Sequence, residues 1–351
     1  MKRLAIYFFW DIDGIVRDFA TFYVHALREV ASEVVVVVNG ELTEESHQKI
    51  TRVSDSVIYR ENKGFDVWAY KEALDTVGWD DLQSYDELIL CNYTCYGPVY
   101  PFSEMFDAMQ ERRCDFWGVA KHPEQPNYLL PDKKGYIYEH IMSYFLVVRH
   151  NMLISGEFKN YWGNIPYISS KTESTALHET VFTKHFEELG YQSDAFVDLA
   201  HYRGRCNNSS IILSNELLIK DRCPLVKRRA FFFPHYDNLL EISAVDQAQK
   251  TLRFIQEHTS YDVNLIWDDI LETQKMSDIK THLHLNYIIS DSRVEKSVKP
   301  LNSVKYAFII YIPKKFYIDI FYQYLSRISE NVPVLFLYPN SEIMDEALKK
   351  N

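Results

Sequence analysis

The chain has 351 residues, of which 47% are hydrophobic, 25% charged and 15% aromatic. This composition excludes disorder as the main state, because there is enough apolar surface to offset the entropy lost on folding. The 38 basic and 49 acidic residues give a net charge of −11, which argues against nucleic acid as a partner. Only 11 residues are glycine, and no GxGxxG or GxxxxGKS/T phosphate loop is present.

Cysteine usage and the first apolar stretch predict a cytoplasmic protein. The five cysteines form no CxxC pair and no zinc-like cluster with histidine, so we expect free thiols in a reducing compartment. The stretch at residues 4–10 ends at Asp11 and is too short for a signal sequence or a membrane span. At most, we expect peripheral contact with the cytoplasmic face of the membrane.

The first part of the chain alternates predicted strands and helices. Residues 4–9 are a short apolar run typical of a buried strand, and apolar residues from Phe19 to Val30 recur at helical spacing. Five consecutive valines at 34–38 indicate a strand covered on both faces, as in a parallel sheet. Strand, helix and strand at this spacing predict a βαβ unit.

This alternation continues to about residue 240. Further strands are predicted at 56–59, 87–91, 115–120 and 144–149, and further helices near 65–77, 102–109 and 181–189. We therefore predict one α/β domain over residues 1–240, with a mostly parallel, Rossmann-like sheet and flanking helices.

The rest of the chain is predicted to form two more parts. We interpret residues 241–302 as a helical extension and a polar linker. Residues 303–351 contain an expected strand, helix and strand, which repeat the order at the N-terminus. One such unit cannot bury both faces of its sheet, so we predict the start of a second Rossmann-like module in a longer natural chain.

In an open α/β sheet the ligand lies beyond the carboxyl ends of the strands, and a turn at residues 61–66 occupies such a place. Asn62, Lys63 and Gly64 precede a helix, where backbone N–H groups and an amide suit the base and ribose of a nucleotide. Asp66 lies in the first turn of that helix. The alternative is an ordinary turn between a strand and a helix.

A second polar segment, Asn92, Tyr93 and Thr94, follows the next predicted strand. A pair of carboxylates here would hold a divalent metal against a diphosphate, but the segment offers an amide, a phenol and a hydroxyl. We therefore predict no metal ligands, while the use of Mg²⁺ or Mn²⁺ stays open.

Two residues are candidates for acid–base chemistry. Glu179 is expected near the start of a helix, where the dipole favours the ionised carboxylate and a sugar hydroxyl could give up its proton to it. The alternative is that Glu179 only stabilises the helix. His140 is either a substrate contact or a core histidine at the start of a strand.

Charged residues elsewhere are further candidates for donor binding. Asp11 and Asp13 are either loop acids or contacts to a nucleobase. Arg228 and Arg229 belong to a basic stretch at 220–233, which could neutralise a diphosphate, adhere to anionic lipid or form a solvated face.

Together these segments resemble inverting glycosyltransferases with the nucleotide-diphospho-sugar-binding GT-A fold, and more closely the rhamnan synthesis protein F family. The resemblance rests on the residues at 61–66, 92–98, 115–118 and 140–145, on Glu179, and on the basic stretch at 220–233. It covers residues 1–240, and the later repeat suggests a second module of the same kind.

The resemblance implies transfer of rhamnose from dTDP-L-rhamnose to a growing, lipid-linked cell-wall or capsular polysaccharide, with Glu179 as the base. The chain departs from the family pattern at Asn92-Tyr93-Thr94, where relatives often have Asp-x-Asp or Asn-Asp-Ser. Basic residues could stabilise the diphosphate instead of a metal. A non-catalytic subunit of a polysaccharide assembly complex is the competing hypothesis, and a nucleotidyltransferase fits less well because it needs metal carboxylates.

Overall fold

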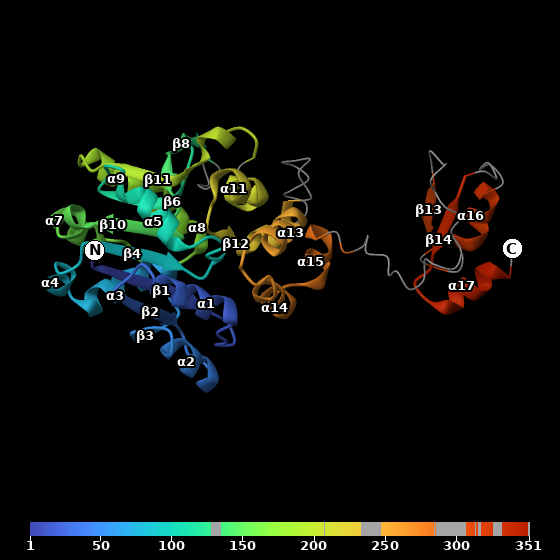
Figure 1. Ribbon diagram of the computed structural model, residues 1–351, viewed down its shortest axis with the longest axis horizontal. Coiled ribbons are helices and arrows are strands. Elements are labelled where there is room, and N and C mark those ends of the chain that lie inside the picture. Colours follow the sequence, from blue (N-terminus) through green and yellow to red (C-terminus); the bar gives the residue numbers. More distant parts are fainter. Residues whose placement is uncertain are drawn as a thin grey trace. The chain divides into compact units, whose positions relative to one another are not determined.

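The computed structural model describes residues 1–127, 135–206, 208–232, 247–283, 285, 307–312, 314, 317–325 and 332–349. The chain divides into two compact units, Met1–Tyr287 and Ile288–Asn351 (Figure 1). The predicted linker at 290–302 lies outside the described residues.

An eight-stranded sheet forms the centre of the first unit, in the order β11-β6-β10-β4-β1-β2-β3, with β9 paired to β6. Neighbouring strands from β3 to β4 run parallel, whereas β10 runs antiparallel to both of its neighbours. The predicted mostly parallel sheet is therefore confirmed. Its strands are β1 (Arg3–Trp10), β2 (Glu33–Asn39), β3 (Ser56–Arg60), β4 (Glu87–Asn92), β6 (Phe116–His122), β9 (His140–Ile141), β10 (Phe145–Arg149) and β11 (Ser193–Asp198).

Helices cover both faces of this sheet, and each face has its own hydrophobic core. The β2 valines are between 0% and 2% exposed, because alternate residues point into the two cores. One core includes α1 (Asp18–Leu27) and α5 (Phe102–Gln110). The other includes α3 (Phe65–Val77), α7 (Gly156–Gly163) and α9 (Thr180–Glu188).

Shorter elements complete the first unit. Its short strands are β5 (Cys95–Tyr96), β7 (Gln125–Pro126), β8 (Tyr136–Ile137) and β12 (Val226–Lys227), and β5 pairs with β12. Its other helices are α2 (Glu44–Thr51), α4 (Trp79–Leu82), α6 (His150–Leu153), α8 (Lys171–Ser174), α10 (Ser209–Ile212) and α11 (Ser214–Asp221), with 3₁₀ turns at Leu199–Tyr202 and Arg228–Phe231.

The helix that carries Glu179 begins earlier than the sequence predicts. Helix α8, a π turn at Thr175–Glu179 and α9 follow one another without a break, and Ser170 caps the first turn by accepting a hydrogen bond from the Glu173 amide. Because helical turns from Lys171 precede Glu179, the expectation that it lies near the start of a helix was wrong. The carboxylate is not stabilised by a free helix N-terminus.

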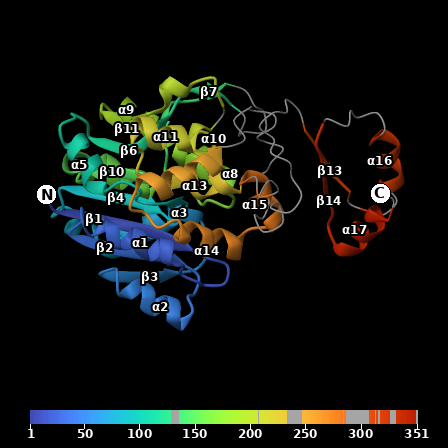
Figure 2. The same ribbon diagram turned by 45° about the vertical axis from the view of Figure 1, so that its right-hand side comes forward.

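Helices α13 (Gln247–His258), α14 (Asn264–Thr273) and α15 (Met276–His282) belong to the first compact unit. Helix α13 packs against α11, and α14 lies beside α1 in both ribbon views (Figures 1 and 2). Their apolar residues, including Ile255, Ile266 and Ile270, join the same core as α1 and α5. Helices α13–α15 are thus packed against the sheet domain.

The second unit is small in its described part. Strands β13 (Phe308–Tyr311) and β14 (Val334–Leu337) pair in parallel, and α16 (Tyr317–Leu325) and α17 (Ser341–Leu348) complete it. Its core centres on Ile312, Ile318 and Ala347. That this unit begins a second glycosyltransferase-like module stays a prediction.

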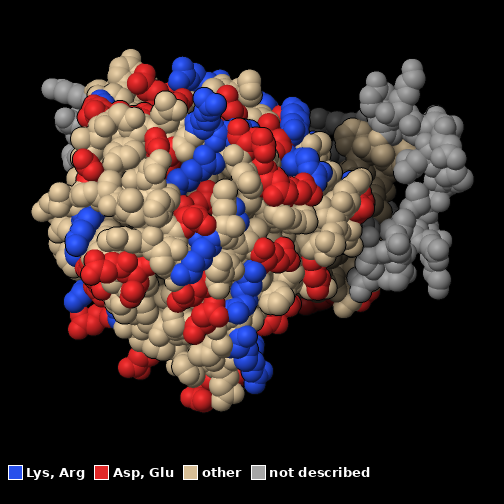
Figure 3. All heavy atoms as spheres, turned by 60° about the vertical axis from the view of Figure 1, so that its left-hand side comes forward, with Lys and Arg blue, Asp and Glu red and all other residues tan. Residues whose placement is uncertain are grey.

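The described surface carries charges of both signs. On the face shown in Figure 3, Lys and Arg side chains are interspersed with Asp and Glu, without a large patch of one sign. No helix within the described ranges has the length and apolar character that crossing a bilayer requires.

Candidate functional site

A buried arginine shapes the turn that follows β3. The guanidinium of Arg60 donates to the side-chain oxygen of Asn39 and, over 2.9 Å, to the backbone carbonyl of Lys63. It also donates two hydrogen bonds of 2.8 Å to the carboxylate of Glu72. These contacts fix the path of the chain between β3 and α3. The sequence analysis did not select Arg60. The only sequence signal for this residue was its position directly after the predicted strand at 56–59.

Gly64 is required at the end of this turn. Its φ is +70°, and a Cβ atom would lie 2.4 Å from Cβ of Trp68. Only glycine avoids that overlap and adopts this φ without strain. Asn62 is exposed and accepts a 3.3 Å hydrogen bond from Asn39, while the exposed Lys63 pairs with Glu61 at 2.8 Å.

A chain of hydrogen bonds joins the turn after β3 to the turn after β4. The hydroxyl of Ser174 and the amide nitrogen of Asn92 donate to the two carboxylate oxygens of Asp66, over 3.1 and 3.2 Å. The hydroxyl of Thr94 donates to the Asn92 oxygen over 2.6 Å and accepts from the Lys227 ammonium over 3.3 Å. The structure therefore brings four distant segments together, around three of the residues that the sequence analysis selected.

Tyr93 lies between Asn92 and Thr94 in this turn and packs against β1. Its ring packs edge-on against Phe8 and Phe9 of β1, with centroid distances of 5.7 and 5.6 Å. Burial raises the pKa of its phenol to about 12, so the hydroxyl stays protonated at neutral pH. Tyr93 is placed to support the turn at Asn92–Thr94 from the side of β1.

Glu179 faces the loop before β10. One carboxylate oxygen accepts a 3.0 Å hydrogen bond from the backbone N–H of Ser143. Burial raises the pKa of Glu179, but the attraction of His140 and Lys227 and the hydrogen bonding of Ser143 outweigh it, so the net pKa is lowered. Glu179 is therefore ionised at neutral pH. Ser143 lies in the segment 140–145 that carries the family resemblance, but it was not selected as a site residue, because a single serine before a strand is common.

The pKa of Asp66 is shifted in the opposite direction to that of Glu179. Its burial and the repulsion from Glu179 raise its pKa, although Ser174 and backbone amides favour the charged form. Two carboxyl groups with separated pKa values thus lie within electrostatic reach of each other. That arrangement is common where one group must accept a proton.

His140 is a buried imidazole at 5% exposure. Its Nδ1 lies 2.7 Å from the carbonyl oxygen of Tyr138, and its ring stacks on that of His122 with centroids 5.3 Å apart. Burial lowers the pKa of His140, although the charge of Glu179 opposes this. At neutral pH the imidazole is uncharged, and because Nδ1–H donates to the carbonyl, Nε2 has a lone pair to accept a hydrogen bond.

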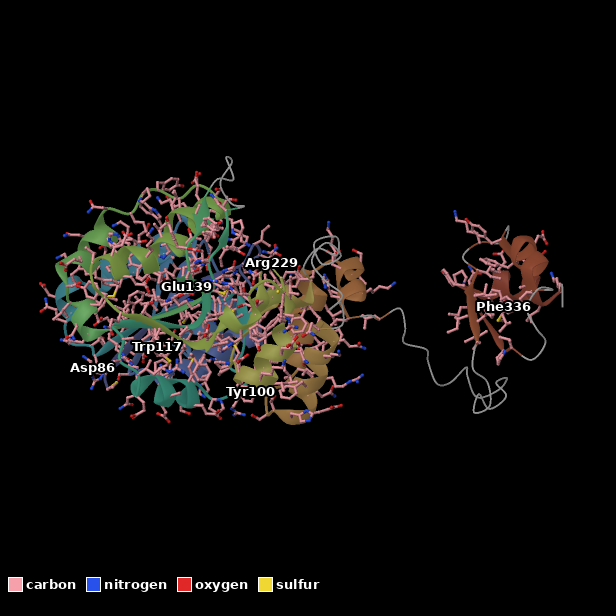
Figure 4. All side chains as sticks on the ribbon, turned by 90° about the horizontal axis from the view of Figure 1, so that it is seen from above. Asp86, Tyr100, Trp117, Glu139, Arg229 and Phe336 are labelled. Atoms are coloured by element: carbon pink, nitrogen blue, oxygen red, sulfur yellow. The ribbon has the colours of Figure 1, made fainter. Side chains whose placement is uncertain are left out.

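Three cationic side chains influence one another at this edge of the sheet. Lys227 lies 3.9 Å over the ring of Tyr144 as well as near Thr94. Partial desolvation lowers the pKa of the Lys171 ammonium, and the positive charges of Arg229 and Lys227 lower it further. Figure 4 labels Arg229, on the side of the first unit where α13–α15 lie. Like charges held this close favour an anionic ligand between them. Lys171 was missed because it lies alone in a polar segment.

The other predicted donor contacts have protein partners of their own. Arg228 donates two hydrogen bonds to Asp269 of α14, over 2.9 and 2.8 Å. Asp11 accepts from Arg17 at 2.7 Å and from the amides of Asp13 and Ile15 at 3.0 Å each. Asp13 is exposed in the same loop. The structure does not bring Asp11 or Asp13 into direct contact with Asp66 or Glu179.

The residues at the candidate site do not fit a divalent metal of the kind that an Asp-x-Asp pair binds. The Asn92 oxygen already accepts from the amide and the hydroxyl of Thr94, and both oxygens of Asp66 accept hydrogen bonds. Within the ranges that the structure describes, no three His, Cys, Asp or Glu side chains form a group that could hold a metal ion.

A family model described as rhamnan synthesis protein F matches residues 34–349, which include most of both compact units. An uncharacterized protein, y4gN, from Sinorhizobium fredii is 23% identical over 163 residues, covering 45% of this chain and 39% of that protein. The chain thus spans well under half the length of this relative.

Two solved structures are weakly similar in fold. Glucosyl-3-phosphoglycerate synthase from Mycobacterium tuberculosis, in complex with Mn²⁺, UDP-glucose and phosphoglyceric acid, is 10% identical over 43% of this chain and 58% of its own, with a TM-score of 0.29. Core-mannan synthase A from Aspergillus fumigatus is 10% identical over 46% and 63%, with a TM-score of 0.25. At these TM-scores the likeness carries no argument about function.

Proposed function

Because this chain belongs to the rhamnan synthesis protein F family, we propose that it is an inverting glycosyltransferase that acts at the edge of the sheet formed by the ends of β3 and β4. The observation that carries the proposal is that an ionised Glu179 lies within electrostatic reach of Asp66, which Asn92 and Thr94 join in a chain of hydrogen bonds. Transfer from a nucleotide-linked sugar requires a general base and polar groups that bind the donor, and both lie at one edge of this sheet.

The donor is held in two places in this proposal. The base and ribose contact the turn at Asn62–Gly64, where the side-chain amide of Asn62 is exposed. The diphosphate lies between Lys171, Lys227 and Arg229, whose positive charges offset the charge that develops on the leaving group. Arg228 does not bind the diphosphate in this proposal. It pairs with Asp269 of α14 and so supports the chain next to Lys227 and Arg229.

Glu179 acts as the general base. Its carboxylate takes the proton from the acceptor hydroxyl as that oxygen bonds to the anomeric carbon of the donor. The bond from that carbon to the diphosphate breaks, and the nucleoside diphosphate leaves with the electron pair. The neutral His140 accepts a hydrogen bond from a sugar hydroxyl and so orients the substrate.

The family name supports a more specific reading. We propose rhamnose as the transferred sugar, dTDP-L-rhamnose as the donor, and a lipid-linked cell-wall or capsular oligosaccharide as the acceptor. Such an acceptor would be reached at the cytoplasmic face of the membrane.

A panel of nucleotide sugars tests the proposal. Calorimetry with dTDP-, UDP- and GDP-linked sugars, followed by turnover with each donor that binds, is expected to show one clear preference, for dTDP-rhamnose. Absence of binding by every donor would overturn the donor site. Binding without hydrolysis or transfer, unchanged by substitution of Glu179, would instead favour a non-catalytic subunit.

A further inference from the structure

We infer that the hydrogen bond between Tyr161 and His178 locks the π turn at Thr175–Glu179 and thereby positions the carboxylate of Glu179. Tyr161 and His178 are positioning residues in this inference, since neither is adjacent to the proposed substrates. The inference rests on the proposed role of Glu179 as the base.

The lock is a buried, specific contact between two helices. The hydroxyl of Tyr161, on α7, lies 2.8 Å from Nδ1 of His178, which is 3% exposed. The imidazole also packs against the rings of Tyr161, Trp162 and Phe182, with centroid distances of 5.8, 5.2 and 5.5 Å. His178 therefore has one orientation, set by α7.

The protonation states of both partners suit a neutral hydrogen bond. Burial lowers the pKa of His178 to about 4 and raises that of the Tyr161 phenol. At neutral pH the imidazole is therefore uncharged and the phenol protonated. In either tautomer of the neutral imidazole, one hydrogen bond joins the Tyr161 hydroxyl to Nδ1 of His178.

The π turn explains why this contact bears on Glu179. A π turn inserts an additional residue into a helix, so the side chains that follow it would shift around the axis if it relaxed to an α turn. His178 and Glu179 are its last two residues; His178 is buried in the aromatic cluster, whereas Glu179 reaches the Ser143 amide. Fixing His178 therefore fixes the direction of the neighbouring carboxylate.

A second contact holds the same helix on its other side. The hydroxyl oxygen of Thr183, which is fully buried, accepts a 2.9 Å hydrogen bond from the backbone N–H of Ile141 in β9. The helix is thus held by α7 through His178 and by β9 through Thr183. Glu179 lies between these two attachments, opposite Ser143.

The test uses the whole chain with four substitutions. Tyr161→Phe removes the hydroxyl, and His178→Leu removes its hydrogen-bond partner. His178→Asn retains a polar group that can bond to the hydroxyl near the place of Nδ1. Tyr202→Phe is the matched control, because it removes a tyrosine hydroxyl bonded at 2.6 Å to Asp221, away from the helix of Glu179.

We expect Tyr161→Phe and His178→Leu to lower kcat by roughly 10–100-fold, as small misplacements of a reacting group do, while the KM for the donor stays near the wild-type value. Loss of the Ser143 hydrogen bond would also raise the pKa of Glu179, so the acidic limb of the kcat profile should move to higher pH. The other titratable groups that face Glu179, namely His140, Lys227, Asp66 and Lys171, are unchanged in these variants; His178 is itself replaced in one of them but is already uncharged at neutral pH. His178→Asn should recover most of kcat, and Tyr202→Phe should leave both quantities unchanged.

A second readout separates this inference from the proposed function. Carbon-13 NMR of the glutamate carboxyl groups can follow the titration of Glu179 without any turnover. If wild-type protein transfers no sugar, the proposed function fails, yet a rise in the Glu179 pKa in both variants would still support the lock. An unchanged Glu179 titration in folded Tyr161→Phe and His178→Leu proteins would overturn it.

Discussion

Arg228 and Asp269 form a buried bidentate ion pair across 41 residues of sequence, with N–O distances of 2.9 and 2.8 Å. Asp269 has no exposed surface and also accepts a hydrogen bond from the hydroxyl of Tyr96. The guanidinium lies 5.6 Å from the ring centroid of Tyr93, beside the turn that contains Asn92. Helix α14 is therefore joined to the candidate site by a charged contact as well as by apolar packing.

Removing the charge of Asp269 should destabilise the first unit. Asp269→Asn leaves Arg228 buried without its counter-ion, and loss of one partner of a buried ion pair typically costs about 3–5 kcal/mol. Urea unfolding measures the change. Asp268→Asn is the control, because Asp268 is the exposed neighbour on the same helix. Equal effects of the two substitutions would show that the ion pair does not stabilise the fold.

Replacing Glu179 tests the base. Glu179→Gln retains an oxygen for the Ser143 amide but removes the basicity, so donor binding should persist while transfer falls by roughly 10²–10⁴. Glu173→Gln is the control on the same helical stretch, where Glu173 accepts hydrogen bonds from Ser169. Transfer rate and melting temperature should be measured on both proteins. Wild-type turnover by a folded Glu179→Gln protein would move the base elsewhere, with Asp66 and His140 next to be tested.

The cationic residues should determine affinity for the diphosphate. Lys171→Met and Lys227→Met each remove one positive charge, and a hydrogen bond to a charged group contributes about 1.5–3 kcal/mol, so Kd for dTDP should rise by roughly 10–100-fold. Lys159→Met is the control. Lys159, on α7, lies 5.9 Å from the ring centroid of Trp79, and its replacement should leave the Kd for dTDP unchanged. Calorimetry at low and high salt measures the difference in Kd between each variant and the wild-type protein. That difference should be smaller at high salt, because salt screens the charges. Affinity that is insensitive to both variants would place the diphosphate elsewhere.

Chelation tests the diphosphate chemistry in a second way. Since the described oxygens of Asp66 and Asn92 are already hydrogen-bonded, EDTA should lower transfer far less than in an enzyme with an Asp-x-Asp pair. The measurement is transfer rate before and after chelation, with Mg²⁺ or Mn²⁺ added back. Complete loss that manganese restores would show that other groups, such as Asp11 or Asp13, hold an ion.

His178 should make folding sensitive to acid. Its folded pKa of about 4 lies below the ordinary 6.5, so between these pH values the unfolded chain binds a proton that the folded protein does not. The free energy of unfolding therefore decreases as pH falls through this window, by about 3 kcal/mol in total for this group. Urea unfolding of wild-type protein at pH 7 and pH 5 should show a larger difference than that of His178→Leu. Identical differences in both proteins would contradict a buried, neutral His178.

Much of the fold follows from local sequence. The valines of β2 and the helical spacing in α1 and α3 predict a parallel α/β sheet, because a strand or helix covered by others must carry apolar residues at a fixed period. The helices that pattern analysis did not predict, such as α2 and α7, have eight residues and only two buried residues each, too few to repeat a helical period. The antiparallel direction of β10 has no local signature, since a strand of either direction has the same alternation of side chains.

The polar segments that follow the strands can be located from the sequence, and their positions predict that Asp66, Asn92 and Thr94 could form one site. The tertiary structure joins them through Ser174, which is 108 residues from Asp66, and Lys227, which is 133 residues from Thr94. It also decided that Arg228 pairs with Asp269 and that a Ser143 amide, rather than a helix N-terminus, binds Glu179. Hydrogen bonds and ion pairs of this kind depend on which surfaces pack together. Such packing produces no periodic pattern in the sequence near either partner, so the sequence does not predict these pairs.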